Sequence, residues 1–285
     1  MFAAPEYHSM PETIHCPTHG ETERTYVCCH LTGDSAGLGF HCAEPHEENP
    51  FPDAWCYDCN LIFEAHDGWN DQSEGLLDIR ILCSWCYERS RIRNSRTDVS
   101  FEDLDSLRWK CGSCEEWHYG ACLDFGFDFP AYWTKEDDEN NQADWLETGS
   151  TELPTTLLTD DICIRNGEDY FIRGRIELPI IGTAETFCWG VWGSLSRENF
   201  QKIIDMDEDP EPVELSPMFS WLSNNIDNYP ETLNLKMYAH VQAQNRRPIF
   251  ELELTEHPLS QEYHHGITPE RVKEIMKRRL DLPEA

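Results

Sequence analysis

The feature that most constrains this chain is a series of closely spaced cysteines and histidines in its first 125 residues. Two Cys-x2-Cys pairs, Cys56/Cys59 and Cys83/Cys86, are separated by 23 residues. Four thiolates from two such pairs complete the tetrahedral shell that zinc prefers, and each pair requires a tight turn of the chain. The spacing therefore predicts one zinc site formed by these four cysteines.

A second set of ligands lies upstream, with Cys16 and His19 followed by Cys28 and His30. Alternating residues of a strand point to opposite sides, so Cys28 and His30 can point together while Cys29 points away. A cross-brace arrangement, in which Cys16 and His19 join one of the Cys-x2-Cys pairs, is also open. Three neighbours could replace or join members of this set: Cys29, His41 and Cys42.

A third set follows downstream and consists of Cys111, Cys114, His118 and Cys122, with Cys163 as a competitor for the fourth position. Four protein ligands leave no open position for water, so we interpret all three sets as structural zinc sites. A catalytic zinc would need three ligands and a nearby carboxylate base. Two carboxylates beside this set keep that alternative open: Glu115 and Glu116.

The thirteen cysteines favour metal binding over a disulfide framework. Their number is odd, they are mixed with histidine, and the N-terminal residues contain no apolar signal segment. No apolar run approaches the roughly 20 residues needed to span a membrane. We therefore expect a soluble, cytoplasmic protein with two to three structural Zn²⁺ ions.

The formal net charge of -32 is the second constraint on function. Acidic residues outnumber basic ones along the whole chain. Binding to phosphate needs a cationic surface, so this charge argues against nucleic acid as a ligand. It favours fast, electrostatically steered association with a basic protein. We expect such a partner, and neither nucleic acid nor a membrane.

The pattern along the chain predicts a flexible tail (1–13), a zinc-ribbon-like module (14–98) and an α+β domain (101–285). Residues 88–98 are polar and locally basic, which predicts a linker. In the second domain, Asn166-Gly167 between two β-type runs indicates a hairpin. Further strands are expected at 187–195, 233–243 and 249–254, with helices at 196–206 and from Thr268-Pro269 onward. This pattern is typical of an antiparallel sheet with a few helices.

Several motifs in the second domain resemble a known family. They include Trp109-x-Cys111-x2-Cys114, Trp189-Gly190-Val191-Trp192, Trp221-Leu222-Ser223-Asn224 and His257-Pro258-Leu259. In this order they resemble an uncharacterised bacterial family, domain of unknown function twenty-one ninety-nine, over residues 109–280. The resemblance implies no assigned activity. The family's opening motif, Trp-x-Cys-x2-Cys-Gly-x2-His, matches Cys111, Cys114 and His118.

This chain departs from the family pattern at two positions. Glu115 stands where glycine is usual, and Cys122 lies in a neighbourhood that is often proline, which weakens Cys122 as a ligand. The N-terminal segments around Cys16, Cys56 and Cys83 resemble a separate bacterial zinc-binding module.

The sequence contains no motif of a known catalytic nucleophile, nucleotide-binding loop or zinc protease. We therefore predict a non-enzymatic, acidic zinc-binding protein that acts by binding another protein. One specific form of this hypothesis is an immunity or inhibitor protein that neutralises a basic bacterial toxin such as a nuclease. The alternatives are a zinc-dependent hydrolase and a structural or regulatory zinc-finger adaptor.

Overall fold

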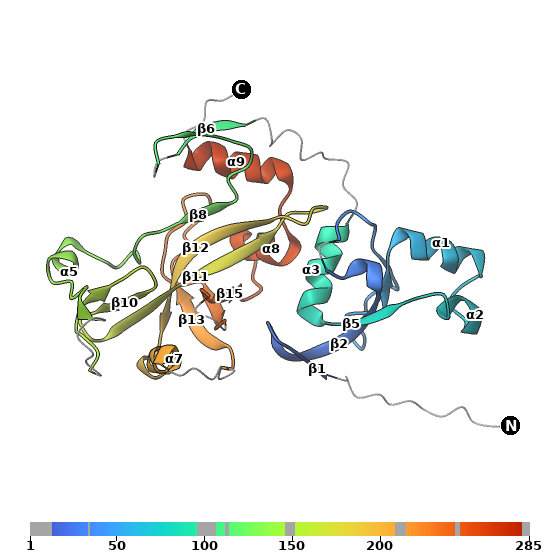
Figure 1. Cartoon of the computed structure of the whole chain (residues 1–285), viewed down its shortest axis with the longest axis horizontal. Helices are drawn as coiled ribbons and strands as arrows, with labels where there is room; N and C mark the ends of the chain where they lie inside the picture. Colours follow the sequence, from blue (N-terminus) through green and yellow to red (C-terminus); the bar gives the residue numbers. More distant parts are fainter. Residues whose placement is uncertain are drawn as a thin grey trace. The chain divides into compact units, whose positions relative to one another are not determined.

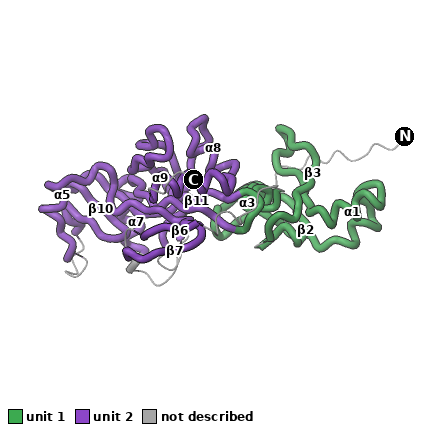
Figure 2. Tube along the Cα trace, turned by 90° about the horizontal axis from the view of Figure 1, so that it is seen from above, with its two compact units in different colours: residues 1–98, 181–184 green, residues 99–180, 185–285 purple. Residues whose placement is uncertain are grey.

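The computed structural model describes residues 13–33, 35–95, 107–111, 114–145, 152–208, 215–242 and 246–280. The chain divides into two compact units, one of residues 1–98 with 181–184 and the other of residues 99–180 with 185–285 (Figure 2). Residues 1–12 of the expected tail, 96–98 of the expected linker and the expected start of the second domain lie outside the described residues.

Unit 1 combines short strands with three α-helices and one 3-10 helix in its described part (Figure 1). Its elements are β1 (Thr13–Cys16), β2 (Gly20–Cys28), the 3-10 helix η1 (Cys29–Leu31), β3 (His41–Cys42), β4 (Ala54–Trp55), α1 (Tyr57–Ala65), α2 (Asp71–Glu74), β5 (Ile79–Cys83) and α3 (Ser84–Asn94).

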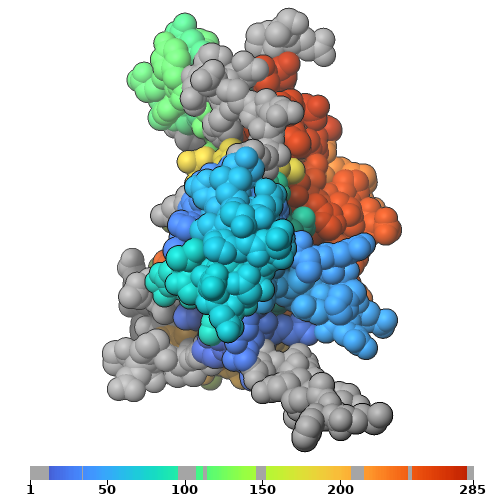
Figure 3. Space-filling view, turned by 90° about the vertical axis from the view of Figure 1, so that its right-hand side faces the viewer, coloured from blue at the N-terminus to red at the C-terminus, as the bar shows by residue number. Residues whose placement is uncertain are grey.

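Strand β2 is the central strand of the sheet in unit 1. It pairs antiparallel with β1 along its first half and with β5 along its second half, and in parallel with β4 at Val27. The turn into β2 is tight because Gly20 has a φ of 72°, a conformation that glycine adopts without strain. The blue β1–β2 segment and the cyan β5–α3 segment adjoin on the surface in Figure 3.

The core of unit 1 is built partly from cysteines. Its buried members are Val27, Cys28, Leu31, Ala54, Cys56, Cys59 and Tyr87, packed by partly buried aromatic residues such as Phe40 and Phe51. The predicted linker at 88–98 is wrong over residues 88–94, because α3 continues to Asn94. The side chains of Ser90 and Asn94 are buried there, and Ser90 donates a hydrogen bond to the carbonyl of Leu31.

Unit 2 contains the larger sheet, and its elements follow in chain order. They are β6 (Arg108–Lys110), β7 (Trp117–Tyr119), β8 (Asp124–Gly126), α5 (Lys135–Glu139), β9 (Leu157–Leu158), β10 (Ile162–Arg165), β11 (Asp169–Pro179), β12 (Thr186–Leu195), α7 (Arg197–Glu208), β13 (Met218–Leu222), β14 (Lys236–His240), β15 (Ile249–Leu252), α8 (Pro258–His265) and α9 (Pro269–Arg279).

Five of these strands close into a barrel. Strands β11 to β15 pair antiparallel in chain order, and β15 returns to pair with β11 at Arg175 and Ile249. The first and last of five alternating strands run in the same direction, so the closing pair has to be parallel, as it is here. Figure 1 shows the long paired strands β11 and β12 side by side.

Two glycines allow the barrel to fill its interior. A Cβ atom on Gly174 would lie 2.5 Å from the ring of Phe250, and one on Gly193 would lie 2.6 Å from the same ring. Phe250 is fully buried, and β11 and β12 can pack closely against its ring because glycine has no side chain at these two positions.

The strand and turn pattern of unit 2 follows the expectations closely. Asn166 and Gly167 have φ angles of 54° and 66°, a left-handed conformation that Asn and Gly adopt readily in tight turns, and they lie in the three-residue loop between Arg165 of β10 and Asp169 of β11. Thr268 caps α9 by accepting a hydrogen bond from the N–H of Arg271, with Pro269 in the first turn. The predicted α+β class is confirmed. In the described part of the chain, no helix has the length and apolar composition that crossing a membrane requires.

Candidate metal centres

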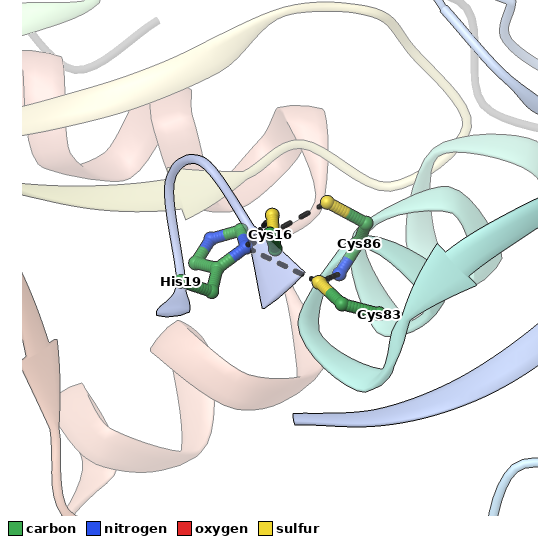
Figure 4. Close-up of side chains that lie close together, drawn as sticks. All are labelled: Cys16, His19, Cys83 and Cys86. Atoms are coloured by element: carbon green, nitrogen blue, oxygen red, sulfur yellow. Dashed lines mark hydrogen bonds between the residues drawn. The ribbon is translucent and has the colours of Figure 1, made fainter. Parts of the chain in front are cut away.

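The first cluster joins Cys16 and His19 to Cys83 and Cys86. Cys16 ends β1 and His19 lies in the turn before β2, whereas Cys83 ends β5 and Cys86 lies in the first turn of α3. Figure 4 shows the imidazole of His19 and the three thiols converging on one point. A hairpin turn and the start of a helix are thus brought together by the β1–β2 and β2–β5 pairings.

The distances in this cluster match those of a tetrahedral metal site. Nδ1 of His19 lies 3.5 Å from Sγ of Cys16, 3.4 Å from Sγ of Cys83 and 3.6 Å from Sγ of Cys86. Zinc bonds of about 2.3 Å to sulfur and about 2.05 Å to nitrogen give a tetrahedral nitrogen–sulfur edge of roughly 3.6 Å. The four ligand atoms therefore surround a space of the size that such an ion occupies.

The second cluster is formed by Cys28, His30, Cys56 and Cys59. Cys28 ends β2, His30 lies in η1, Cys56 precedes α1 and Cys59 lies in its first turn. Nδ1 of His30 is 3.5 Å from Sγ of Cys56 and 3.4 Å from Sγ of Cys59. Three of these residues belong to the core of unit 1, so this cluster forms part of that core.

The grouping of ligands differs from the main expectation. Cys56/Cys59 and Cys83/Cys86 were predicted to form one site, and that prediction is wrong, because each pair joins a different cysteine–histidine pair. The expected partnership of Cys16/His19 with Cys28/His30 is likewise wrong. Strand β2 separates the two halves: Cys16 and His19 precede it, Cys28 ends it, and β5 brings Cys83 to its N-terminal half.

The observed arrangement is the alternative considered in the sequence analysis, in which Cys16 and His19 join a Cys-x2-Cys pair. The ligand pairs of the two clusters are nested along the sequence, however, and do not alternate as they would in a cross-brace. The outermost pairs in the sequence form the first cluster, and the inner pairs form the second. Each cluster has three thiols and one imidazole, so a bound divalent ion with three thiolates would carry a net charge of about -1. The expected four-cysteine set would carry about -2.

Both clusters place thiols at helix starts. The Sγ of Cys83 accepts a hydrogen bond from the N–H of Cys86 at the start of α3, at 3.3 Å. The Sγ of Cys28 accepts one from the N–H of Cys56, just before α1, also at 3.3 Å. Backbone N–H groups at a helix N-terminus stabilise negative charge, so both contacts favour the thiolate form that binds metals.

The acidity of the thiols shows why a cation would stabilise these clusters. A hydrogen bond between the Cys86 and Cys83 side chains lowers the pKa of Cys83 to about 3, with further contributions from His19 and the N–H of Cys86 and despite the opposing effect of burial. The same hydrogen bond and burial raise the pKa of Cys86. Burial also raises the pKa of Cys28 and of Cys59. Most of these buried thiols therefore retain protons unless a divalent ion compensates the charge of the thiolates.

The third cluster holds three ligands, Cys111, Cys114 and His118, around the β6–β7 hairpin. Sγ of Cys114 is 3.1 Å from Nε2 of His118, and Cys114 is exposed. Trp109 stacks on the imidazole of His118, with ring centroids 4.7 Å apart. Within the described residues this cluster offers one ligand fewer than the other two.

Neither candidate for a fourth ligand joins the third cluster. Sγ of Cys122 lies 3.5 Å from the carbonyl of Asp124, at the start of β8, and β8 is held in place by its pairing with β12. Cys163 is fully buried and packs against Phe171 and Trp192 in an apolar cluster. The expectation that Cys122 completes this site is therefore not met.

The remaining candidates lie outside the clusters of the described residues. Cys29, His41 and Cys42 belong to none of them, and each of the thirteen cysteines is a free thiol. One aromatic neighbour was not anticipated: Trp85 stacks on His19 with ring centroids 6.0 Å apart. Its position between Cys83 and Cys86 is the signal that could have indicated this contact.

A comparison with models of known protein families finds a match in unit 2. Residues 110–267, more than half of the chain, match the model of a family described as an uncharacterized protein conserved in bacteria (DUF2199). The chain belongs to this family. The DUF2199 match covers the third cluster and the barrel, whereas the first and second clusters lie before it. No curated protein and no solved structure matches the chain.

The DUF2199 region contains a buried polar contact that accounts for one of its motifs. Asn224 accepts a hydrogen bond from the N–H of Trp192 at 2.7 Å and donates one to the carbonyl of Phe129 at 2.9 Å. The side chain of Asn224 thereby links β12 to the segment that follows β8. The motifs Trp189–Trp192 and Trp221–Asn224 thus meet at a structural joint of the barrel.

Proposed function

We propose that this protein binds two structural zinc ions in its N-terminal unit and acts by binding another protein. The observation that carries this proposal is the presence of two complete sets of four ligands, each with three cysteines and one histidine. A set of four protein ligands leaves no coordination position for water or substrate. Such sites stabilise a fold, which suits a unit whose core includes three of the ligands.

Zinc is the metal that best fits these ligands. Thiolates combined with imidazole in tetrahedral geometry are typical of Zn²⁺, and three thiolates exclude the hard cations Mg²⁺ and Ca²⁺. The test is the zinc content per chain, measured by elemental analysis together with circular dichroism during chelation. We expect the metal of the first two clusters and the structure of unit 1 to be lost together. A folded unit 1 without metal would contradict the proposal.

The proposed partner is a basic protein, and the support is the net charge of -32. Carboxylates of an acidic protein can cover the cationic surface with which a nuclease binds its substrate. In its specific form, the proposal is therefore that of an immunity or inhibitor protein that neutralises a basic bacterial toxin. A more general form is a zinc-finger adaptor that binds a basic protein without inhibiting it.

Affinity capture with the full-length chain tests this part of the proposal. We expect recovery of a basic protein at low salt and its release between 0.1 and 0.5 M NaCl, over which the screening length falls about twofold. A nuclease assay on the recovered complex then separates inhibitor from adaptor. Capture of neutral or acidic proteins, or a complex insensitive to salt, would contradict a charge-driven interaction.

The alternative of a zinc-dependent hydrolase is supported by one observation. The third cluster has three ligands in its described part, and Glu115 and Glu116 lie between Cys114 and His118. Three ligands and a nearby carboxylate are the requirements for activating a zinc-bound water. Hydrolysis of an activated ester by the zinc-loaded protein, abolished in His118→Ala and retained in Cys122→Ser, would favour this alternative over the binding function.

A further inference from the structure

The outer surface of the barrel carries an unusual group of aromatic side chains. Phe219 and Trp221 on β13 and Tyr238 on β14, here called the aromatic face, are 41%, 38% and 39% exposed. The intervening residues of the same strands point into the barrel and are buried. Aromatic rings grouped on the solvent side of a sheet are typical of binding surfaces, because their exposure to water is unfavourable.

The rings of the aromatic face support one another. Phe219 lies between the other two, with its ring centroid 5.0 Å from that of Trp221 and 5.9 Å from that of Tyr238. The planes are inclined at 87° and 77°, the edge-to-face geometry that aromatic pairs prefer. These contacts hold the rings in place, so a ligand loses little affinity to ordering them.

Carboxylates border the aromatic face along β15. Glu251 is the direct cross-strand partner of Tyr238, and its Oε2 lies 2.6 Å from Nε2 of His240. Just beyond β15, Glu253 forms an ion pair with Lys236 at 3.5 Å, and Lys236 is the cross-strand partner of Trp221. The positive charge of Lys236 is therefore already neutralised by Glu253, and the whole chain is strongly acidic.

We propose that the aromatic face binds arginine side chains presented by a segment of a basic protein. The planar guanidinium group stacks on aromatic rings and also forms paired hydrogen bonds with carboxylates. Aromatic rings beside Glu251 and Glu253 offer both kinds of contact. The charge of the chain disfavours ligands that carry phosphate. The inference rests on the proposed function, because it supplies the surface on which a basic partner would bind.

The test uses the full-length protein and a fluorescein-labelled peptide of alternating arginine and glycine, followed by fluorescence anisotropy. A second peptide has citrulline at each arginine, which keeps the shape and removes the charge, and a third has lysine. Trp221→Ala and Tyr238→Ala alter the face, and Phe129→Ala is the control because Phe129 is an aromatic residue that is 49% exposed and lies outside β13 and β14. Glu253→Gln is compared with Glu198→Gln, which also removes a carboxylate paired with a lysine.

We expect the arginine peptide to bind the wild type, and Trp221→Ala or Tyr238→Ala to weaken that binding at least tenfold. Phe129→Ala and Glu198→Gln should change it less than twofold, whereas Glu253→Gln should weaken it several-fold. The lysine peptide should bind more weakly than the arginine peptide, and the citrulline peptide should not bind.

Three outcomes would overturn this inference. They are equal binding of the arginine peptide by wild type and Trp221→Ala, equal binding of the citrulline peptide, and no binding of the arginine peptide to the wild type. In each case affinity capture of a basic partner would still be able to succeed, so the proposed function is tested separately. A failed capture alongside binding of the arginine peptide at the aromatic face would instead contradict the proposed partner alone.

Discussion

At the scale of single residues, the side chain of Asn224 joins two parts of the barrel that are distant in sequence. It is 2% exposed and pairs with the backbone groups of Trp192 and Phe129. A buried backbone N–H or C=O group without a hydrogen-bond partner lowers the stability of the fold. The side-chain amide of Asn224 supplies a partner to both groups where water cannot. The DUF2199 motif around Trp221 thus has a structural explanation.

We predict that Asn224→Ala lowers the free energy of unfolding by about 2–6 kcal/mol, because it leaves the buried N–H of Trp192 and the partly buried carbonyl of Phe129 unpaired at about 1–3 kcal/mol each. Urea unfolding followed by tryptophan fluorescence measures this change. The matched control is Asn225→Ala, since Asn225 is exposed and accepts a long hydrogen bond from the N–H of Thr232 at 3.3 Å. An equal effect of the two substitutions would show that Asn224 is not a joint of the barrel.

At the scale of elements, the short helix α5 is attached to β10 through Asp137. The carboxylate of Asp137 accepts hydrogen bonds from the N–H and hydroxyl of Thr134 at 2.9 and 2.7 Å. Arg165 on β10 donates a further one at 3.1 Å. Burial opposes ionisation, but these hydrogen bonds and the charge of Arg165 outweigh it and lower the pKa of Asp137.

A lowered pKa in the folded state means that the ionised form of Asp137 stabilises the fold. This contribution is complete above the unfolded pKa of about 3.9 and is lost as the pH falls through the folded value. We predict that Asp137→Asn is less stable than wild type at pH 7 and that the difference shrinks below about pH 4. Thermal unfolding across this range measures it, with Asp138→Asn as the exposed control. A difference that does not depend on pH would contradict the assigned role.

A metal ion bound at the β6–β7 hairpin should be released more easily than those proposed for unit 1. Its cluster has three described ligands, none of them buried, whereas each cluster of unit 1 has four ligands, of which at least one is buried. We predict that a chelating dye removes one metal ion rapidly without loss of circular dichroism and the other two slowly with unfolding. His118→Ala should abolish only the rapid phase. A single phase that includes all the metal would contradict this distinction.

The elements show which parts of the structure local sequence patterns determine. The turn at Asn166-Gly167, the cap at Thr268 and the alternation in β15 are local, and the structure has them where the pattern places them. The nested pairing of ligands was not predictable, because it depends on β5 and β1 meeting β2. Closure of the barrel depends in the same way on one long-range pair, Arg175 with Ile249.

The linker predicted at 88–98 illustrates a different limit. Its polar, basic composition is compatible with a loop, yet α3 runs through residues 84–94 because Cys83 caps it and Ser90 and Asn94 are buried. Tertiary contacts of a few polar side chains stabilise a helix here in place of a loop, and composition alone does not reveal such contacts. The same reasoning applies to Cys122, whose position follows from the pairing of β8 with β12.

At the scale of the whole molecule, the net charge of -32 should affect stability as well as association. Like charges repel one another in the compact state, and salt screens this repulsion. We predict that the melting temperature rises between 0.05 and 0.5 M NaCl at pH 7, measured by calorimetry on the metal-loaded protein. Sucrose at the same osmolarity serves as the control for effects other than screening. A fall with NaCl would mean that attractive ion pairs dominate.

The central claim is that the outer and inner ligand pairs of unit 1 form two separate zinc sites, and zinc stoichiometry of double variants tests it most directly. In Cys16→Ser/Cys83→Ser, both substitutions affect the first cluster, so we predict the loss of one zinc per chain. In Cys56→Ser/Cys83→Ser, the two clusters each lose a ligand, so we predict the loss of two. Loss of two ions in the first variant and of one in the second would contradict the nested arrangement.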